Sequence, residues 1–248
     1  MQRYDGKRVL VTGATGGLGT EICRRLATEG ARLVVADLAG TALEGVAAGL
    51  EGGPHQALAL DVSLEDDWRA AVRAVEALGG LDVLVNNAAI GSLATVEDEE
   101  RERWDAVMSV DATGVWLGMK HLGPVIERSG GGAVVNVASI LGSTGGLGNS
   151  IAYHAAKGAV RTMTKNAALH WATRGVRVNS LHPGFIETPQ LLERYEGSER
   201  HRAMLDNTPM RRLGRPEEIA GAVAFLGSDD AGYMTGAELY ADGGWTAR

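Results

Sequence analysis

The stretch Arg8-Val-Leu-Val-Thr-Gly-Ala-Thr-Gly-Gly-Leu-Gly19 decides how the rest of the chain is interpreted. Its first five residues form an apolar run typical of a buried strand, and a helical pattern follows from Gly19 to Glu29. Glycines between a strand and a helix let the backbone approach a pyrophosphate at the helix N-terminus, where free N–H groups and the helix dipole favour an anion. The stretch therefore predicts the opening strand–turn–helix unit of a dinucleotide-binding fold, and a structural turn without ligand is the alternative.

The same alternation of strand and helix continues to the end of the chain. Further strands are expected at 32–37, 56–61, 83–86, 133–138, 176–181 and 238–241, and helices at 41–50, 64–78, 99–121, 151–173 and 216–226. Continuously apolar strands that alternate with helices predict a parallel sheet covered on both faces. No linker divides residues 1–248, so we expect a single Rossmann-like α/β domain with a doubly wound, parallel, seven-stranded sheet.

The composition excludes several classes of protein. The net charge of −7 over 248 residues gives no support to a nucleic-acid partner. The single cysteine, Cys23, rules out an internal disulfide and fits a reducing compartment. There is no basic-then-apolar leader and no apolar stretch near the length of a membrane span, so we expect a cytoplasmic protein without a membrane partner. No metal site is predicted.

Residues that directly follow strands are the candidates for ligand binding, because open parallel sheets bind ligands at the carboxyl ends of their strands. The second strand ends at Asp37, whose carboxylate can accept a hydrogen bond from an adenosine ribose and would repel a 2′-phosphate. No Arg or Lys occupies the glycine turn, and Leu38 stands where a basic residue could bind that phosphate. We therefore predict NAD rather than NADP, with a solvated turn aspartate as the alternative. Asp61 and Val62, after the third strand, are placed to meet an adenine ring, although Asp61 is equally plausible as a turn residue.

The pair Tyr153 and Lys157 lies within the Ala-rich stretch Ile151-Ala-Tyr-His-Ala-Ala-Lys157. At a spacing of four residues, both side chains leave the same face of a helix. A free tyrosine has a pKa of about 10, and a nearby ammonium favours the phenolate and lowers that pKa. Taken alone, the pair could equally be an incidental feature of an exposed helical face.

Together these motifs resemble those of the short-chain dehydrogenase/reductase family along nearly the whole chain. The segments that carry the resemblance are the glycine turn at 12–19, Asn86–Ala89 after the fourth strand, Ser139 with Tyr153 and Lys157, the loop Pro183–Thr188 and the sequence Asp242–Gly244.

The resemblance implies an enzyme that interconverts a secondary alcohol and its ketone with NAD(H). Tyr153 would be the general acid or base, Lys157 would lower its pKa and bind the nicotinamide ribose, and Ser139 would hydrogen-bond the substrate oxygen. A homotetramer is also implied. The residues expected at the cofactor are Gly13, Thr15, Gly17, Leu18, Gly19, Asp37, Leu38, Asp61, Val62, Asn87, Ala88, Val110, Tyr153, Lys157, Pro183, Gly184, Ile186 and Thr188.

Three positions depart from the family pattern. Ala89 replaces the usual glycine of the strand-four motif, and the glycine-rich segment 142–149 is about a residue longer than usual. Asp111 stands where the family generally has a catalytic asparagine, whose main-chain carbonyl holds a water that links the lysine to solvent. Its carboxylate could pair with Lys157 or raise the tyrosine pKa. The hypothesis is that the enzyme is active and Asp111 works through its backbone, which a many-fold faster Asp111→Asn variant at neutral pH would contradict.

The expected substrate pocket is mostly apolar and consists of Ile140, Leu141, Leu147, Phe185, Leu191, Leu192, Tyr195 and Met204. No Arg or Lys lies beside Ser139 or Tyr153 to hold a carboxylate or phosphate, which favours a neutral alcohol or ketone, cyclic or aromatic. The segments 139–142 and 242–247 resemble those of the family's alicyclic-alcohol and cyclic-ketone reductases. The segment 188–213 shows little periodicity, and we expect an irregular lid over the substrate, with a plain surface loop as the alternative.

Two other functions remain open. The segments 184–188 and 222–236 resemble reductases of 3-oxoacyl thioesters, which usually prefer NADP and need a basic surface for an acidic carrier protein. Asp37 argues against this function, while Arg211, Arg212 and Arg215 keep it open. A catalytically silent NAD-binding sensor or scaffold is the second alternative, and only Asp111 and Ala89 support it.

Overall fold

A seven-stranded parallel sheet forms the centre of the protein in the computed structural model, which describes residues 2–40 and 42–248. Its strand order is β3-β2-β1-β4-β5-β6-β7. After β3 the chain crosses back to the other side of β1, so the point where the strand order reverses lies between the neighbours β1 and β4. The strands are β1 (Arg8–Thr12), β2 (Arg32–Asp37), β3 (Gln56–Ala59), β4 (Val83–Asn86), β5 (Gly132–Val137), β6 (Val176–Pro183) and β7 (Glu238–Ala241). The predicted fold class is confirmed.

Both faces of the sheet are buried because its strands carry apolar residues in succession. Val9 and Val11 belong to the core on one face and Leu10 to the core on the other, and all three are fully buried. Side chains of a strand point alternately to opposite faces, so an uninterrupted apolar run has a partner layer on each side. This explains why the strands lack the polar alternation of a half-exposed sheet.

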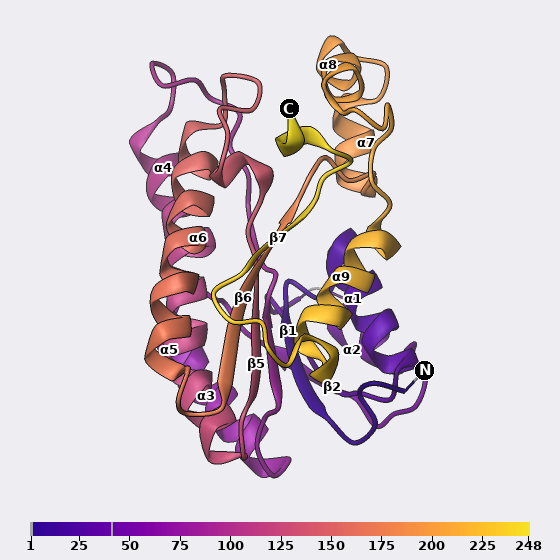
Figure 1. The fold of residues 1–248 in the computed structure, drawn as a ribbon, viewed down its shortest axis with the longest axis vertical. Coiled ribbons are helices and arrows are strands. Elements are labelled where there is room, and N and C mark those ends of the chain that lie inside the picture. The colour runs from indigo at the N-terminus through magenta and orange to yellow at the C-terminus, as the bar shows by residue number, and fades with distance from the viewer. Residues whose placement is uncertain (1, 41) are drawn as a thin grey trace.

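Helices form the two outer layers, as Figure 1 shows. On one side α1 packs against α9, with α2 beside the sheet edge, and on the other α3 packs against α5 and α4 against α6. The bounds are α1 (Gly17–Thr28), α2 (Leu43–Ala48), α3 (Glu65–Ala77), α4 (Arg101–Met108), α5 (Gly114–Arg128), α6 (Ile151–Trp171) and α9 (Pro216–Gly227). Thr41, where the sequence places the start of the second helix, lies outside the described residues.

The long helix expected at 99–121 is interrupted. A π-helical turn at Ser109–Thr113 separates α4 from α5, and α5 continues to Arg128. A π turn replaces the i→i−4 hydrogen bonds of the helix by i→i−5 bonds, and such turns are frequent at functional sites. The interruption contains Asp111. The residue that departs from the family's sequence pattern therefore lies in the turn that departs from α-helical geometry.

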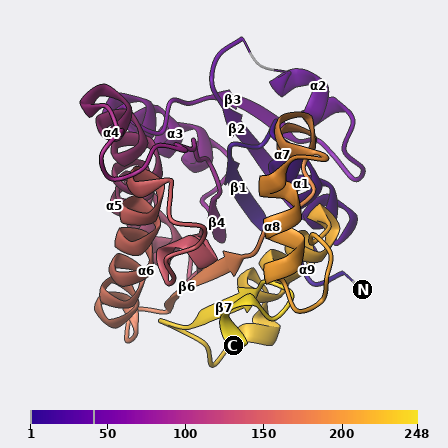
Figure 2. The same cartoon turned by 90° about the horizontal axis from the view of Figure 1, so that it is seen from above.

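The segment predicted as irregular, 188–213, instead contains two helices, α7 (Pro189–Tyr195) and α8 (Glu199–Asn207). Each begins with a side-chain cap: Thr188 accepts a hydrogen bond from Leu191 N, and Ser198 accepts one from His201 N. Such caps satisfy N–H groups that have no partner in the first turn. These helices stand beyond the carboxyl ends of the strands, above α9 in Figure 1 and on the right-hand side of Figure 2, next to α1 and α9.

The fold thus brings the carboxyl ends of β1, β2, β4, β5 and β6 to one rim of the sheet, at the end of the molecule where α7 and α8 stand. Ligand sites of open α/β sheets lie at this rim, next to the point where the strand order reverses. Within the described residues, no helix has the length and hydropathy needed to cross a bilayer.

Candidate active site

A cavity of about 860 Å³ occupies this rim of the sheet. All eighteen residues predicted at the cofactor line it, although they come from segments between Gly13 and Thr188. Ser139 lines it as well, whereas Asp111 lies behind the wall and is fully buried. The structure therefore gathers the residues predicted at the cofactor, together with Ser139, around one cavity.

The glycine turn after β1 leaves no room for a side chain at Gly13 or Gly19. Gly13 has φ +63°, and a Cβ atom there would lie 2.7 Å from the Cα of Ala88, while a Cβ on Gly19 would lie 2.0 Å from the Gly13 carbonyl oxygen. The following helix, α1, has no side-chain cap and no acidic residue in its first turn. Its free N–H groups can therefore bind an anion, so the turn fits the diphosphate of a dinucleotide.

Thr12 and Asn87 join the glycine turn to the end of β4. The Thr12 hydroxyl accepts hydrogen bonds from Asn87 N at 3.0 Å and Ala88 N at 3.1 Å, and the Asn87 side chain donates to the Thr12 and Gly13 carbonyls. Asn87 thus supports the cofactor turn as well as lining the cavity. Ala89 does not have a positive φ, so the usual glycine at this position is not required here.

Asp37 and Asp61 both make local hydrogen bonds at the adenosine end of the cavity. Asp37 Oδ2 accepts from Thr15 N at 2.9 Å and from the Thr15 hydroxyl at 2.6 Å. Asp61 Oδ1 accepts from Ser63 N and its hydroxyl, which is the arrangement of a turn residue. A carboxylate oxygen accepts more than one hydrogen bond, so Asp37 retains capacity for a ribose hydroxyl.

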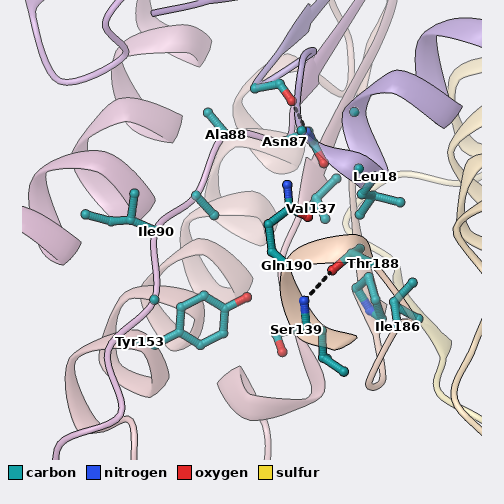
Figure 3. Close-up of a pocket in the computed structure, with 18 of the residues that line it drawn as sticks. Leu18, Asn87, Ala88, Ile90, Val137, Ser139, Tyr153, Ile186, Thr188 and Gln190 are labelled. Carbon is teal, nitrogen blue, oxygen red and sulfur yellow. Dashed lines mark hydrogen bonds between the residues drawn. The ribbon is translucent and has the colours of Figure 1, made fainter. Parts of the chain in front are cut away.

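The residues predicted to be catalytic, Ser139, Tyr153 and Lys157, meet in the cavity, where Figure 3 shows the Tyr153 hydroxyl pointing inward on the side of Ser139. Lys157, on the same helix, places its Nζ 5.4 Å from the centre of the Tyr153 ring and donates to the Val137 carbonyl at 3.1 Å. The Ser139 hydroxyl accepts from Leu141 N at 3.1 Å, which leaves its own proton free to be donated.

Asp111 approaches Lys157 from the cavity wall. Its Oδ2 lies 3.4 Å from Lys157 Nζ, and its Oδ1 accepts a hydrogen bond from Ile90 N at 2.8 Å. The lysine side chain is 2% exposed and the aspartate 0%, so little water screens the pair. The Asp111 carboxylate therefore pairs with Lys157. This pairing is one of the two effects that the sequence analysis considered for Asp111.

The charges of these three groups are coupled. Burial raises the pKa of Tyr153 and outweighs Lys157 and a hydrogen bond with Ser139, which lower it, while Asp111 raises it further. Burial also raises the pKa of the Asp111 carboxyl, against the opposing effect of Lys157. Burial alone would lower the pKa of Lys157, but Asp111 and Tyr153 raise it above its usual value. Lys157 is thus held as a cation beside the phenol.

The loop after β6 forms the opposite wall, where the nicotinamide end of a dinucleotide is expected. A Cβ on Gly184 would lie 2.9 Å from Asp242 Cα, so the C-terminal Asp242–Gly244 segment packs directly on this loop. The Thr188 hydroxyl accepts from Leu191 N at 3.3 Å and can still donate its proton into the cavity, which it lines together with Ile186 (Figure 3).

The substrate half of the cavity is only partly as predicted. Six of the eight expected residues line it: Ile140, Leu141, Phe185, Leu191, Tyr195 and Met204. Leu147 packs beside Ile140, Leu141 and Trp245 instead, and Leu192 is absent from the lining. Sequence reasoning missed several other lining residues, which lie on the segment 89–93, just before α6 or on helices that the periodicity did not reveal; they include Ser92, Leu93, Gln190, Arg194 and Arg200.

The chain belongs to the short-chain dehydrogenase/reductase family, as its fold and cavity indicate. Residues 13–246 match a family model described as enoyl-(acyl carrier protein) reductase. The solved structure of a short-chain type dehydrogenase/reductase from Mycobacterium marinum is 32% identical with a TM-score of 0.92, covering 100% of this chain and 98% of that one.

Curated relatives match along nearly their whole length. The chain is 39% identical to galactitol 2-dehydrogenase (L-tagatose-forming) of Cereibacter sphaeroides, covering 98% of this chain and 96% of the relative. It is 40% identical to cyclopentanol dehydrogenase of Comamonas testosteroni, covering 100% of both chains. The predicted reaction class is confirmed: the chain is an oxidoreductase that interconverts an alcohol and a ketone with a nicotinamide cofactor.

Proposed function

We propose that this enzyme interconverts a neutral cyclic secondary alcohol and its ketone, with NAD(H) as its cofactor. The observation that carries the proposal is the meeting of Ser139, Tyr153 and Lys157 in a cavity whose substrate half is lined mainly by apolar side chains. A ring alcohol suits such a half, because its carbon atoms are buried against apolar residues while one oxygen reaches the hydroxyls. The names of cyclopentanol dehydrogenase and other relatives support the same class.

The proton chemistry falls to the side chains around the tyrosine. The Ser139 hydroxyl donates a hydrogen bond to the substrate oxygen and holds it beside the Tyr153 hydroxyl. Tyr153 accepts the alcohol proton during oxidation and returns a proton to the carbonyl oxygen during reduction. Lys157 stabilises the phenolate by its positive charge. A bound nicotinamide supplies the hydride acceptor or donor, and the protein supplies orientation and proton transfer.

The choice of NAD rests on the adenosine end of the cavity. Asp37 is the acidic residue at the end of β2, and its carboxylate would repel the additional phosphate of NADP. No Arg or Lys lines the described cavity beside it, since the lining cations are Lys157, Arg194 and Arg200, which belong to the catalytic and substrate parts.

The alternative function on carrier-protein thioesters loses part of its support in this structure. Arg212 and Arg215 both pair with Glu218, and Arg211 pairs with Asp206. These arginines therefore do not present an unopposed basic surface to an acidic partner. We also retain the homotetramer and the role of 188–213 as a substrate lid as proposals, and α7 and α8 give that lid a defined structure.

The test follows NADH absorbance with a panel of cyclic, aryl and 3-hydroxyacyl-thioester alcohols, each offered with NAD and with NADP. We expect turnover of neutral ring alcohols with NAD. Turnover confined to the thioester with NADP would overturn the proposal in favour of the carrier-protein function. Tight NAD binding by calorimetry without any turnover would instead indicate the silent binding protein.

A further inference from the structure

The substrate half of the cavity contains a cation that the chemistry at Tyr153 does not use. Arg200, on α8, lines the cavity, and its Nη1 donates to the Asn149 side-chain oxygen at 2.9 Å. Its guanidinium lies over the ring of Tyr195, 5.3 Å from the ring centre. Asn149 lies two residues before α6, so Arg200 connects α8 to the beginning of the helix that carries Tyr153.

This guanidinium is incompletely satisfied. Arg200 Nε is buried and has no hydrogen-bond partner among the described residues. The acidic residues that line the cavity are Asp37 and Asp61, both at its adenosine end. A buried charged group without hydrogen-bond partners is costly, so such a group normally has an acceptor in the working state of the protein.

Arg194 is less suited to the same role. It lines the same cavity but also borders a neighbouring cleft together with Asp98, Glu99 and Glu100. Arg194 is an exposed residue, so water can solvate its charge, whereas Arg200 is partly buried and the described lining of the cavity has no acidic side chain in the substrate half. Arg200 is therefore the cation left to interact with a ligand there.

The geometry also fixes which edge of Arg200 is available. Asn149 occupies Nη1, protein encloses Nε and Tyr195 covers one face, which leaves the outer Nη2 edge. The position of Asn149 is fixed in turn, because the following residue, Ser150, has φ 65° and donates its N–H to the Ala94 carbonyl. Nη2 carries two N–H donors that suit an oxygen acceptor, and arginine stays charged at any relevant pH.

We propose that Arg200 forms a second polar subsite, so that the preferred substrate carries a second oxygen function away from the carbon that is oxidised. The class is a ring diol, a hydroxyketone or a related hydroxylated ring alcohol rather than a simple cycloalkanol. This inference rests on the proposed function and names its substrate class more closely. The apolar lining holds the ring, Ser139 and Tyr153 bind the reacting oxygen, and the guanidinium edge binds the second.

The test measures calorimetric binding of cyclohexanol, the isomeric cyclohexanediols and 4-hydroxycyclohexanecarboxylate to the NADH-loaded enzyme, together with kcat/KM of each alcohol with NAD. We expect one or more of the doubly oxygenated ligands to exceed cyclohexanol by about 10- to 100-fold, the value of a hydrogen bond to a charged group. Preference for the diols supports a subsite for an uncharged second oxygen. Preference confined to the acid would overturn the neutral substrate class.

Two variants separate recognition from lid structure. Arg200→Met should abolish the preference while leaving cyclohexanol binding within about threefold, because cyclohexanol has no second oxygen to lose a hydrogen bond, and the Arg200–Asn149 hydrogen bond is lost for all ligands alike. Arg202→Met is the matched control, since Arg202 is an exposed residue of the same helix whose side chain contacts only the Gly197 carbonyl. Equal loss for all ligands in Arg200→Met, or no preference in the wild type, would overturn the inference. Because binding is measured separately from turnover, failure of the proposed oxidation remains distinguishable.

Discussion

Lys157 Nζ lies 3.4 Å from Asp111 Oδ2, and both side chains are buried away from solvent. The catalytic cation thus faces two anionic partners in turn, the Asp111 carboxylate and the Tyr153 phenolate. Asp111 offsets part of the positive charge of Lys157, and that part no longer stabilises the phenolate. The Asp111–Lys157 pair therefore opposes the lowering of the Tyr153 pKa by Lys157. In the proposed mechanism, proton transfer therefore depends on Tyr153, Lys157 and Asp111.

Replacement of Asp111 by Asn should move the pH dependence of alcohol oxidation. Oxidation needs the Tyr153 phenolate, so kcat/KM rises as the pH passes its pKa, and the Asp111 carboxylate raises that pKa. Without the carboxylate the pKa falls, and the rising limb moves to lower pH. The profile is measured for both proteins, with the exposed Asp105→Asn as control. An unmoved limb would mean that Asp111 acts through its backbone alone, as the sequence suggested.

Replacement of Asp37 by Asn should weaken the discrimination between NAD and NADP. The amide keeps the shape of the side chain but removes the charge that repels a 2′-phosphate. We expect the ratio of kcat/KM for NAD to that for NADP to fall by about tenfold or more, the effect of one charged contact. The matched control is Asp66→Asn, because Asp66 is an exposed residue of α3. A ratio that stays constant would place the discrimination elsewhere.

Trp245 should matter for the substrate although it does not line the cavity. Its ring meets Phe185 edge to face at 5.1 Å and packs with Ile140 and Leu141, all three of which do line it. Trp245→Ala should cost about 3 kcal/mol of unfolding free energy and raise KM for the alcohol, while KM for NAD stays near its wild-type value. A rise in both Michaelis constants would show a general loosening of the fold.

The sequence was sufficient for the parts of the molecule whose pattern is local. Each of three features is encoded within a few residues: the continuously apolar strands, the glycine turn, and the spacing of Tyr153 and Lys157. All three lie where the sequence predicts them. Trp245 packs against Phe185 of its own chain. No local pattern predicts this contact, because the two residues are far apart in sequence.

What remained hidden depends on tertiary context. The helices α7 and α8 are short and stabilised by the caps Thr188 and Ser198, so their periodicity is too brief to detect. Arg200 could therefore not be placed in the cavity from sequence. The π turn around Asp111 likewise leaves no compositional signal, since it arises from packing within a continuous helical pattern.

The most direct test of the account is the rate of Tyr153→Phe in NAD-dependent oxidation of a ring alcohol, measured beside NAD binding by calorimetry. The phenyl ring keeps the packing but cannot exchange a proton. The account predicts that kcat falls by about 10²- to 10⁴-fold while NAD affinity stays close to that of the wild type, and that the exposed control Tyr233→Phe changes neither. Retention of most of the wild-type rate by Tyr153→Phe would contradict the assignment of Tyr153 as the general acid and base.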